Sequence, residues 1–262
     1  MLRRFLCVML CLCGARVAYA GDDAARLVTL QQLLTACVAQ LPSDLHHAFV
    51  DTSARRTIRI APRLRKQWSA CVARERDLTD QRAIFNMRDD LLALIHNAAA
   101  IDAATRAEAE AIATRIVQTT RTVGEEYGMV GSPLFNNFLV HVGIKKAGFC
   151  YHWTETLARA VADLPWQHFS HLWGVASLLN VTENNALVIM SRGESVADGI
   201  VYDPWRGAGK PYWRSVAGDH YKWTTRYTER NLAMGVGLDE ISPPHPDSAN
   251  TSDLRRRAND AP

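Results

Sequence analysis

A cysteine at the predicted start of a helix is the residue of this chain best placed for nucleophilic chemistry. Cys150 stands two residues after Gly148, and Leu157, Val161 and Leu164 then recur at spacings of four and three, as on one buried face of a helix. Unpaired backbone N–H groups and the positive end of the helix dipole would favour a thiolate there. Gly148 would allow a sharp turn close to a substrate. The spacing therefore predicts a nucleophilic cysteine.

An aspartate is the second residue with an evident chemical role. Asp203 lies in the run Tyr202-Asp203-Pro204-Trp205, directly after a predicted strand. A carboxylate there, in a domain that also carries the cysteine, could belong to a functional site. Asp-Pro is also a frequent start of a turn, so Asp203 could instead cap the turn through Arg206. The residues alone leave both interpretations open.

The elements that must position these groups fall into two parts. The first part, residues 21–131, is predicted to be a helical N-terminal portion. The predicted helices cover residues 24–41 and 68–76, and two longer ones begin at Thr79 or Asp80 and at Asp102. Residues 57–60 alternate like a short strand. Apolar stripes on the helices indicate a helix–helix core, and no chemistry is visible in this part.

Residues 132–238 are predicted to form the cysteine domain, in which helices give way to an antiparallel sheet. Pro133 opens an apolar helix, and the cysteine helix follows it. Short connections separate the strands predicted over residues 171–179, 185–190 and 199–202, with an edge strand at 211–213. The predicted fold class is therefore α+β, and the two parts could share one core across a soft boundary near residue 131.

The first 20 residues have the organisation of a cleaved secretory signal peptide. Arg3 and Arg4 precede a short apolar run, and Ala18-Tyr19-Ala20 supplies small residues for cleavage near Ala20. The apolar run is too short to span a bilayer as a helix. We therefore expect a periplasmic or secreted protein with no membrane span.

Without those 20 residues the chain is electrically balanced. Arg3, Arg4 and Arg16 are removed, so that 30 basic residues become 27, against 27 acidic ones. The overall charge therefore gives no indication of nucleic-acid binding. Residues 239–262 are rich in Pro, Asp, Ser and Asn and are predicted to form a disordered tail.

The same cleavage leaves three of the six cysteines. An exported protein can keep disulfides, and an odd count leaves one thiol over. The most economical assignment pairs Cys37 with Cys71 and leaves Cys150 free. Three buried, reduced cysteines are the alternative, because free cysteine is among the most buried residue types.

Taken together, residues 148–205 resemble the core of the transglutaminase-like superfamily, which has a papain-like fold. The matching features are Gly148-Phe149-Cys150 at a helix start, the strand that follows, and Val201-Tyr202-Asp203-Pro204-Trp205 after the next strand. The resemblance implies that Cys150 attacks an amide or acyl carbonyl, that a histidine at the start of the second strand is the base, and that Asp203 orients it. Motifs for metals, nucleotides or a serine nucleophile are absent from the sequence, so no cofactor or metal is expected.

The expected histidine is missing from the second strand. That strand opens Glu183-Asn184-Asn185, and the sequence does not decide which asparagine stands at the base position. An amide can hydrogen-bond a thiol but cannot relay a proton near neutral pH. His171 is the best substitute, because it flanks the sheet edge, and a surface or capping role is its alternative.

Two functions follow from this pattern. The first is an exported cysteine hydrolase or acyltransferase acting on peptide or amide bonds, with Cys150 as nucleophile and its backbone N–H as one oxyanion donor. The second is a catalytically inactive transglutaminase-like binding module in the cell envelope. Both imply a peptide or protein substrate or partner in that compartment.

Overall fold

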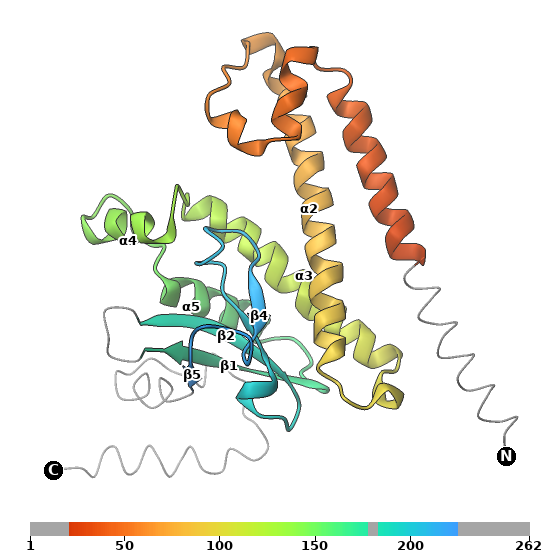
Figure 1. Ribbon diagram of the computed structural model, residues 1–262, viewed down its shortest axis with the longest axis vertical. Coiled ribbons are helices and arrows are strands. Elements are labelled where there is room, and N and C mark those ends of the chain that lie inside the picture. Colours follow the sequence, from red (N-terminus) through yellow and green to blue (C-terminus); the bar gives the residue numbers. More distant parts are fainter. Residues whose placement is uncertain (1–20, 178–182, 225–262) are drawn as a thin grey trace, which may run out of the picture. The chain divides into compact units, whose positions relative to one another are not determined.

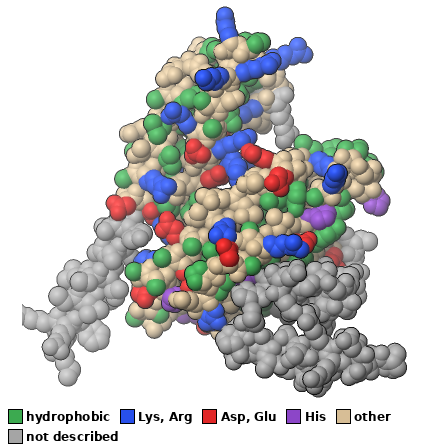
Figure 2. Space-filling view, turned by 180° about the vertical axis from the view of Figure 1, so that it is seen from behind, with side chains coloured by type: hydrophobic (Ala, Val, Ile, Leu, Met, Phe, Trp, Pro, Cys, Tyr) green, Lys and Arg blue, Asp and Glu red, His purple; other side chains and the backbone are tan. Residues whose placement is uncertain are grey.

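The computed structural model describes residues 21–177 and 183–224, and its contacts divide the chain into two compact units (Figure 1). The first unit ends at Phe85 and the second begins at Asn86, whereas the sequence places a boundary near residue 131. The predicted signal peptide and the tail at 239–262 lie outside the described residues, as does part of the connection between the first two strands. Acidic and basic side chains are interspersed over much of the face in Figure 2, in line with the balanced charge.

The described part of the first unit is helical. Residues 21–38 form a helix, and three short 3₁₀ turns lead from it to α2 (Arg65–Ala93). The turns are η1 (Ser43–Phe49), η2 (Thr52–Arg56) and η3 (Pro62–Leu64). The start predicted at Thr79 or Asp80 is wrong, because no Gly or Pro interrupts α2 and the helix continues through both residues. The strand predicted over 57–60 is also wrong, since these residues have no regular secondary structure.

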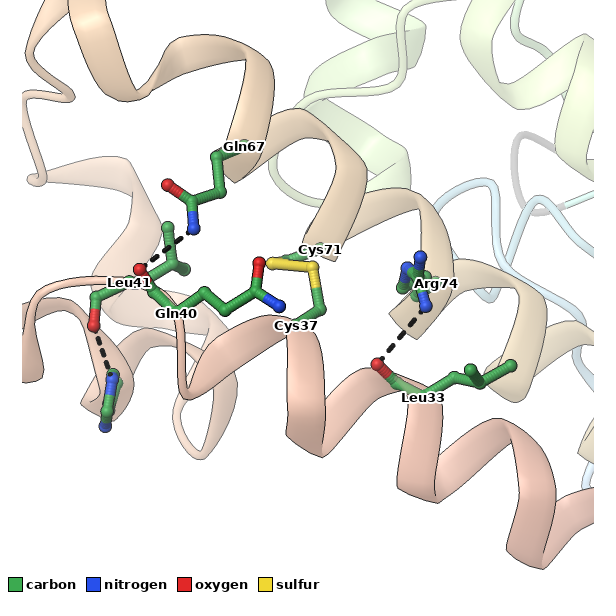
Figure 3. Close-up of a disulfide and its surroundings, with 8 residues drawn as sticks. Leu33, Cys37, Gln40, Leu41, Gln67, Cys71 and Arg74 are labelled. Atoms are coloured by element: carbon green, nitrogen blue, oxygen red, sulfur yellow. Dashed lines mark hydrogen bonds between the residues drawn. A yellow bond between two sulfur atoms is a disulfide. The ribbon is translucent and has the colours of Figure 1, made fainter.

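A disulfide joins the first helix to α2, which confirms the predicted pairing of Cys37 with Cys71 (Figure 3). Their Cα atoms are 5.5 Å apart, and both side chains are buried with Leu41 in one apolar cluster. Beside the cross-link, the Gln67 side chain donates to the Gln40 carbonyl oxygen at 2.9 Å. Cys150 is the free cysteine of the described residues.

Three further helices belong to the second unit, together with the last residues of α2. After η4 (Ala98–Ala100) they are α3 (Ala103–Glu126), α4 (Pro133–His141) and α5 (Cys150–Val161). Asp102 caps α3 by accepting from the Thr105 backbone N–H at 2.8 Å, as the sequence predicts. Ser132 caps α4 in the same way by accepting from the Phe135 backbone N–H, and Pro133 occupies the first turn.

The sheet has five antiparallel strands in the order β4-β3-β2-β1-β5. Its strands are β1 (Phe169–Ala176), β2 (Asn184–Ser191), β3 (Ile200–Tyr202), β4 (Trp213–Ser215) and β5 (Trp223–Thr224), with η5 (Val196–Asp198) between β2 and β3. The predicted α+β class and antiparallel sheet are therefore observed. The edge strand begins two residues later than predicted, and β5 was not foreseen.

The sheet is covered on both faces, which explains why β2 is buried along nearly its whole length. α5 packs on β2 and against α3 on one face, where the Tyr202 hydroxyl lies 2.9 Å from Thr120 Oγ1 of α3. Val188 and Val201 pair on the other face and pack against Val216. Because side chains alternate along a strand, neighbouring residues of β2 contact different layers.

Candidate functional site

Cys150 is the first residue of α5, where the sequence predicts it. Gly148 precedes it with a φ of +133°, a backbone conformation that residues with a Cβ rarely adopt. The Cys150 side chain is 7% exposed and packs with Val123, Trp153 and Trp205. A sharp turn therefore delivers the cysteine to a buried position at the helix start.

His152 caps the start of the same helix. Its Nδ1 atom accepts hydrogen bonds from the backbone N–H groups of Gly148 and Phe149, both at 3.2 Å. Accepting at Nδ1 requires a ring that is deprotonated on that atom. Burial lowers the pKa of His152 and so favours this neutral form. His152 therefore stabilises the turn before Cys150.

The Cys150 sulfur contacts an amide and a backbone carbonyl. The thiol donates to the Glu183 carbonyl oxygen at 3.8 Å, and Asn185 Nδ2 donates to the sulfur at 3.5 Å. Asn185 Oδ1 in turn accepts from Trp173 Nε1 at 2.8 Å. Because an indole N–H can only donate, Trp173 fixes which end of the amide faces the sulfur. The sulfur is thus held as a protonated thiol between a donor and an acceptor.

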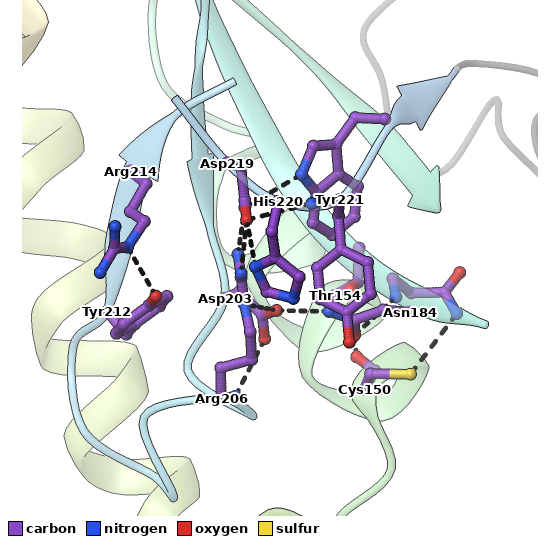
Figure 4. Close-up of polar contacts among 12 residues, drawn as sticks. Cys150, Thr154, Asn184, Asp203, Arg206, Tyr212, Arg214, Asp219, His220 and Tyr221 are labelled. Carbon is purple, nitrogen blue, oxygen red and sulfur yellow. Dashed lines mark hydrogen bonds and ion pairs between the residues drawn. The ribbon is translucent and has the colours of Figure 1, made fainter. Parts of the chain in front are cut away.

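Asn184 contacts the carboxylate instead (Figure 4). Its Nδ2 atom donates to Asp203 Oδ2 at 2.7 Å, and its Oδ1 atom accepts from the Asn185 backbone N–H at 2.9 Å. Neighbouring strand residues point to opposite faces, so the two asparagines divide the contacts between them. Asn184 is therefore the residue that Asp203 orients, and Asn185 is the residue that contacts Cys150.

Asp203 follows β3 and belongs to a buried ionic cluster. Arg206 Nε donates to Asp203 Oδ2 at 2.7 Å, and the same guanidinium donates to both oxygens of Asp219 at 2.9 and 2.6 Å. Trp223 Nε1 also donates to Asp219, at 3.1 Å. The guanidinium lies 4.8 Å from the ring centre of Tyr212. The turn predicted at Asp203 is observed, because its Oδ1 atom accepts from the Arg206 backbone N–H at 3.2 Å. Its other oxygen binds the amide of Asn184, so a role in orienting a base stays a prediction.

The electrostatics of the site oppose a thiolate. Burial raises the pKa of Cys150, the negative charge of Asp203 adds to the rise, and the Asn185 hydrogen bond offsets part of it. The cluster beside the cysteine holds two carboxylates and one guanidinium. The expectation that the helix start would favour a thiolate is therefore corrected, because desolvation of the charged sulfur outweighs the helix dipole.

The structure does not bring His171 to Cys150. β1 and β2 form a hairpin in which His171 pairs with Ile189, while Val175 pairs with Asn185. Four residues along a strand correspond to about 13 Å, so His171 lies toward the opposite end of the sheet. Its ring instead lies 4.2 Å from that of Trp166. Within residues 21–177 and 183–224, no histidine nitrogen hydrogen-bonds the Cys150 sulfur.

Three residues of the site were not singled out from the sequence as members of it. Trp173 fixes the Asn185 amide, and Arg206 and Asp219 hold Asp203 in place. The spacing of three residues between Asp203 and Arg206 was a usable signal, since side chains at that distance meet in a turn. No comparable signal in the sequence marks Asp219, because this residue follows β4 and is distant from Asp203 along the chain.

Comparisons of the chain with models of protein families, with curated proteins and with solved structures found no match. Among the described residues, no three His, Cys, Asp or Glu side chains gather in a way that could hold a metal ion. In that same part of the chain, no helix is both long and apolar enough to cross a membrane. The fold and site define an α+β protein with a buried thiol, two fixed amides and an oriented carboxylate.

Proposed function

We propose that this chain is an exported, transglutaminase-like module that binds a peptide or protein of the cell envelope without cleaving it. The resemblance assigns the roles of nucleophile, base and orienting carboxylate to a helix start, a strand start and the end of the next strand. Cys150, Asn184 and Asp203 occupy such positions and lie in one connected network. This arrangement supports the proposal that the chain keeps a transglutaminase-like fold but binds its partner without cleaving it.

The observation that carries the proposal is the hydrogen bonding of the sulfur. Cys150 meets the Asn185 amide and the Glu183 carbonyl oxygen, and the residue bound to Asp203 is Asn184. A general base must accept a proton near neutral pH, and neither an amide nor a backbone carbonyl does so. A sulfur that stays protonated is a poor nucleophile, because the thiolate is the reactive form.

The alternative is an exported cysteine hydrolase or acyltransferase acting on peptide or amide bonds. One observation favours it, namely that Cys150 is the first residue of α5, where helix N–H groups are available to a developing oxyanion. That mechanism needs a proton acceptor other than a histidine bonded to this sulfur. We therefore rank it second.

Hydrolysis assays distinguish the two functions. Residues 21–262 would be compared with Cys150→Ala on a peptide p-nitroanilide and on a p-nitrophenyl ester at pH 7. We expect the two proteins to release nitroaniline and nitrophenol at equal rates. A rate at least tenfold higher for the unsubstituted chain would overturn the proposal and establish Cys150 as a nucleophile.

A further inference from the structure

Helix α4 carries three of its large apolar side chains outward. Leu134, Phe135 and Phe138 are exposed, whereas the buried residue of this helix is Asn136. The Phe135 and Phe138 rings stack on each other with their centres 6.4 Å apart. A surface helix of a globular protein normally turns its apolar stripe to the core and its polar side chains to water. α4 departs from that pattern, since its most buried residue is an asparagine, although Leu139 and Val140 are partly buried.

Polar contacts hold this helix in place without burying its apolar face. Asn136 Nδ2 donates to the carbonyl oxygens of Val130 and Ser132 at 2.8 and 2.9 Å, and its Oδ1 atom accepts from the Val130 backbone N–H at 3.1 Å. Lys145 Nζ donates to the same Oδ1 atom at 2.6 Å. The hydrogen bonds of the buried Asn136 side chain therefore fix the orientation of α4. In this orientation Leu134, Phe135 and Phe138 face water.

The exposed apolar side chains continue on both sides of α4. We define the α4 surface as Val130, Leu134, Phe135, Phe138, Val142 and Ile144, all of them exposed. Leu134 and Ile144 are 72% and 70% exposed, which is far more than core packing would leave. Six large apolar side chains within one short segment form a patch of the kind that marks an interaction site.

Within the segment that carries this patch the charges have one sign, and Glu125, Glu126 and Glu155 lie just outside it. Residues 127–154 contain Lys145 and Lys146 and no aspartate or glutamate. Lys146 is exposed, and hydrophobic side chains lie beside basic and histidine side chains at the right of Figure 2. Phe and Leu side chains next to lysines fit a phospholipid surface, because apolar groups enter the acyl boundary while lysine reaches the headgroup phosphates. Protein interfaces are enriched in aromatic residues, Met and Arg and depleted in Lys, so the lysines rather than the phenylalanines favour a lipid surface.

We propose that the α4 surface attaches this protein to the surface of an anionic phospholipid bilayer. The short helix would lie in the interface with Leu134, Phe135 and Phe138 inserted and Lys146 near the phosphates. Trp205 Nε1 donates to Asn137 Oδ1 of α4 at 3.0 Å, so the attached helix is joined to the loop that follows Asp203. The inference stands apart from the proposed function, because neither Cys150 nor its partners take part in the attachment.

Flotation with vesicles tests the attachment. Residues 21–262 would be mixed with vesicles of phosphatidylglycerol and phosphatidylcholine, or of phosphatidylcholine alone, and the bound fraction measured. We expect binding to the anionic vesicles, at least a tenfold loss of partitioning for Leu134→Ser/Phe138→Ser, and a weaker loss for Lys146→Gln. Val50→Ser is the matched control, because Val50 is an exposed apolar residue in the first unit, and it should bind like the unsubstituted chain. Circular dichroism would establish that each variant is folded.

Three results would overturn the attachment. They are no flotation of the unsubstituted chain, equal flotation of the double variant, or a dimer in sedimentation that the double variant dissociates while neither protein binds vesicles. The last result would assign the α4 surface to a second copy of the chain. Cys150→Ala should float normally. A loss of flotation would therefore count against the membrane attachment alone, and Cys150-dependent hydrolysis would count against the proposed function alone.

Discussion

The Asn184 amide donates a hydrogen bond to Asp203 Oδ2 at 2.7 Å, between the start of β2 and the end of β3. A histidine that serves a cysteine nucleophile is commonly held by a carboxylate in this manner. Here the carboxylate is buried and ion-paired to Arg206, yet the side chain that it orients cannot titrate. Among the described residues, Asp203 therefore has its hydrogen-bond and ionic partners, and none of them can accept a proton near neutral pH.

Introducing an imidazole at position 184 should create reactivity. In Asn184→His, Nδ1–H can donate to Asp203 as the amide does, which leaves Nε2 to accept a proton. We expect Cys150-dependent hydrolysis of a p-nitrophenyl ester to rise at least tenfold, since a positioned general base contributes about 10²–10⁴ in rate. The assay is release of nitrophenol at pH 7.

Three variants control that experiment. Asn184→Gln keeps an amide and should stay inactive, and Asn184→His with Cys150→Ala should lose the gained rate. Asn184→His with Asp203→Asn should lose most of it, because the ring is no longer oriented. Equal rates for Asn184→His and Asn184→Gln would show that residue 184 is not at the base position.

The cap formed by His152 predicts a loss of stability in mild acid. Because burial lowers the folded-state pKa of His152, the cap contributes stability above the ordinary pKa of about 6.5. That contribution is lost as the pH falls through the lowered folded-state pKa. His152→Asn supplies an acceptor that does not titrate, so its free energy of unfolding should fall less between pH 7.5 and 5, by about 1 kcal/mol.

Urea unfolding at the two pH values measures this difference. His141→Asn is the control, because His141 is exposed at the end of α4. It should keep the pH dependence of the unsubstituted chain. The same slope in His152→Asn would contradict a titrating cap.

Asp219 predicts a second loss of stability at lower pH. Burial alone would raise the pKa of Asp219, but hydrogen bonds from Arg206 and Trp223 lower it to about 2. The ionised carboxylate therefore stabilises the fold above about pH 4, and this stability is lost as the pH falls toward 2. Asp219→Asn should lower the free energy of unfolding by about 2 kcal/mol at pH 7 and flatten its dependence on pH in that window.

Unfolding monitored by fluorescence between pH 2 and 7 tests the Asp219 prediction. Asp198→Asn is a suitable comparison, since Asp198 is exposed and its carboxylate contacts Ser195. That variant should behave like the unsubstituted chain. An Asp219→Asn protein with unchanged stability at pH 7 would show that the ionic cluster is not a stabilising element.

The disulfide predicts a redox-dependent stability of the first unit. The bond between Cys37 and Cys71 closes a loop with a sequence separation of 34 residues. The chain-entropy model then gives about 4 kcal/mol of stabilisation. Reduction, or Cys37→Ala with Cys71→Ala, should destabilise this unit by about that amount in urea unfolding. Alkylation of unfolded residues 21–262 should label one cysteine before reduction and three after it, and three labels before reduction would contradict the bond.

Much of the second unit follows from local signals in the sequence. Asp102 marks the start of α3, Gly148 and the apolar spacing mark α5, and short, largely apolar runs between polar connections mark β1, β2 and β3. The pairing of Cys37 with Cys71 followed from counting cysteines after cleavage of a signal peptide. Apart from that count, each of these signals lies within a few residues of the feature that it predicts.

The features that could not be predicted depend on contacts between distant parts of the chain. Asp219 and Trp223 meet Arg206 only once β4 and β5 have joined opposite edges of the sheet. The expectation of a thiolate at Cys150 was wrong, because burial raises the pKa of this thiol. That burial depends on how distant parts of the chain pack around the helix start. His171 was expected to replace the missing histidine, but it lies far from the start of β2. In the hairpin, the first residues of β1 pair with the last residues of β2.

The proposed function depends on Cys150 being a protonated thiol that, within the described residues, contacts no basic side chain. Its direct test is the rate of alkylation by iodoacetamide as a function of pH, followed by mass spectrometry on residues 21–262. We predict a midpoint above the ordinary cysteine pKa of about 8.5, because burial and Asp203 raise the pKa of Cys150. A midpoint below about 7 would contradict the account, because such a thiolate requires a cationic or basic partner at the sulfur.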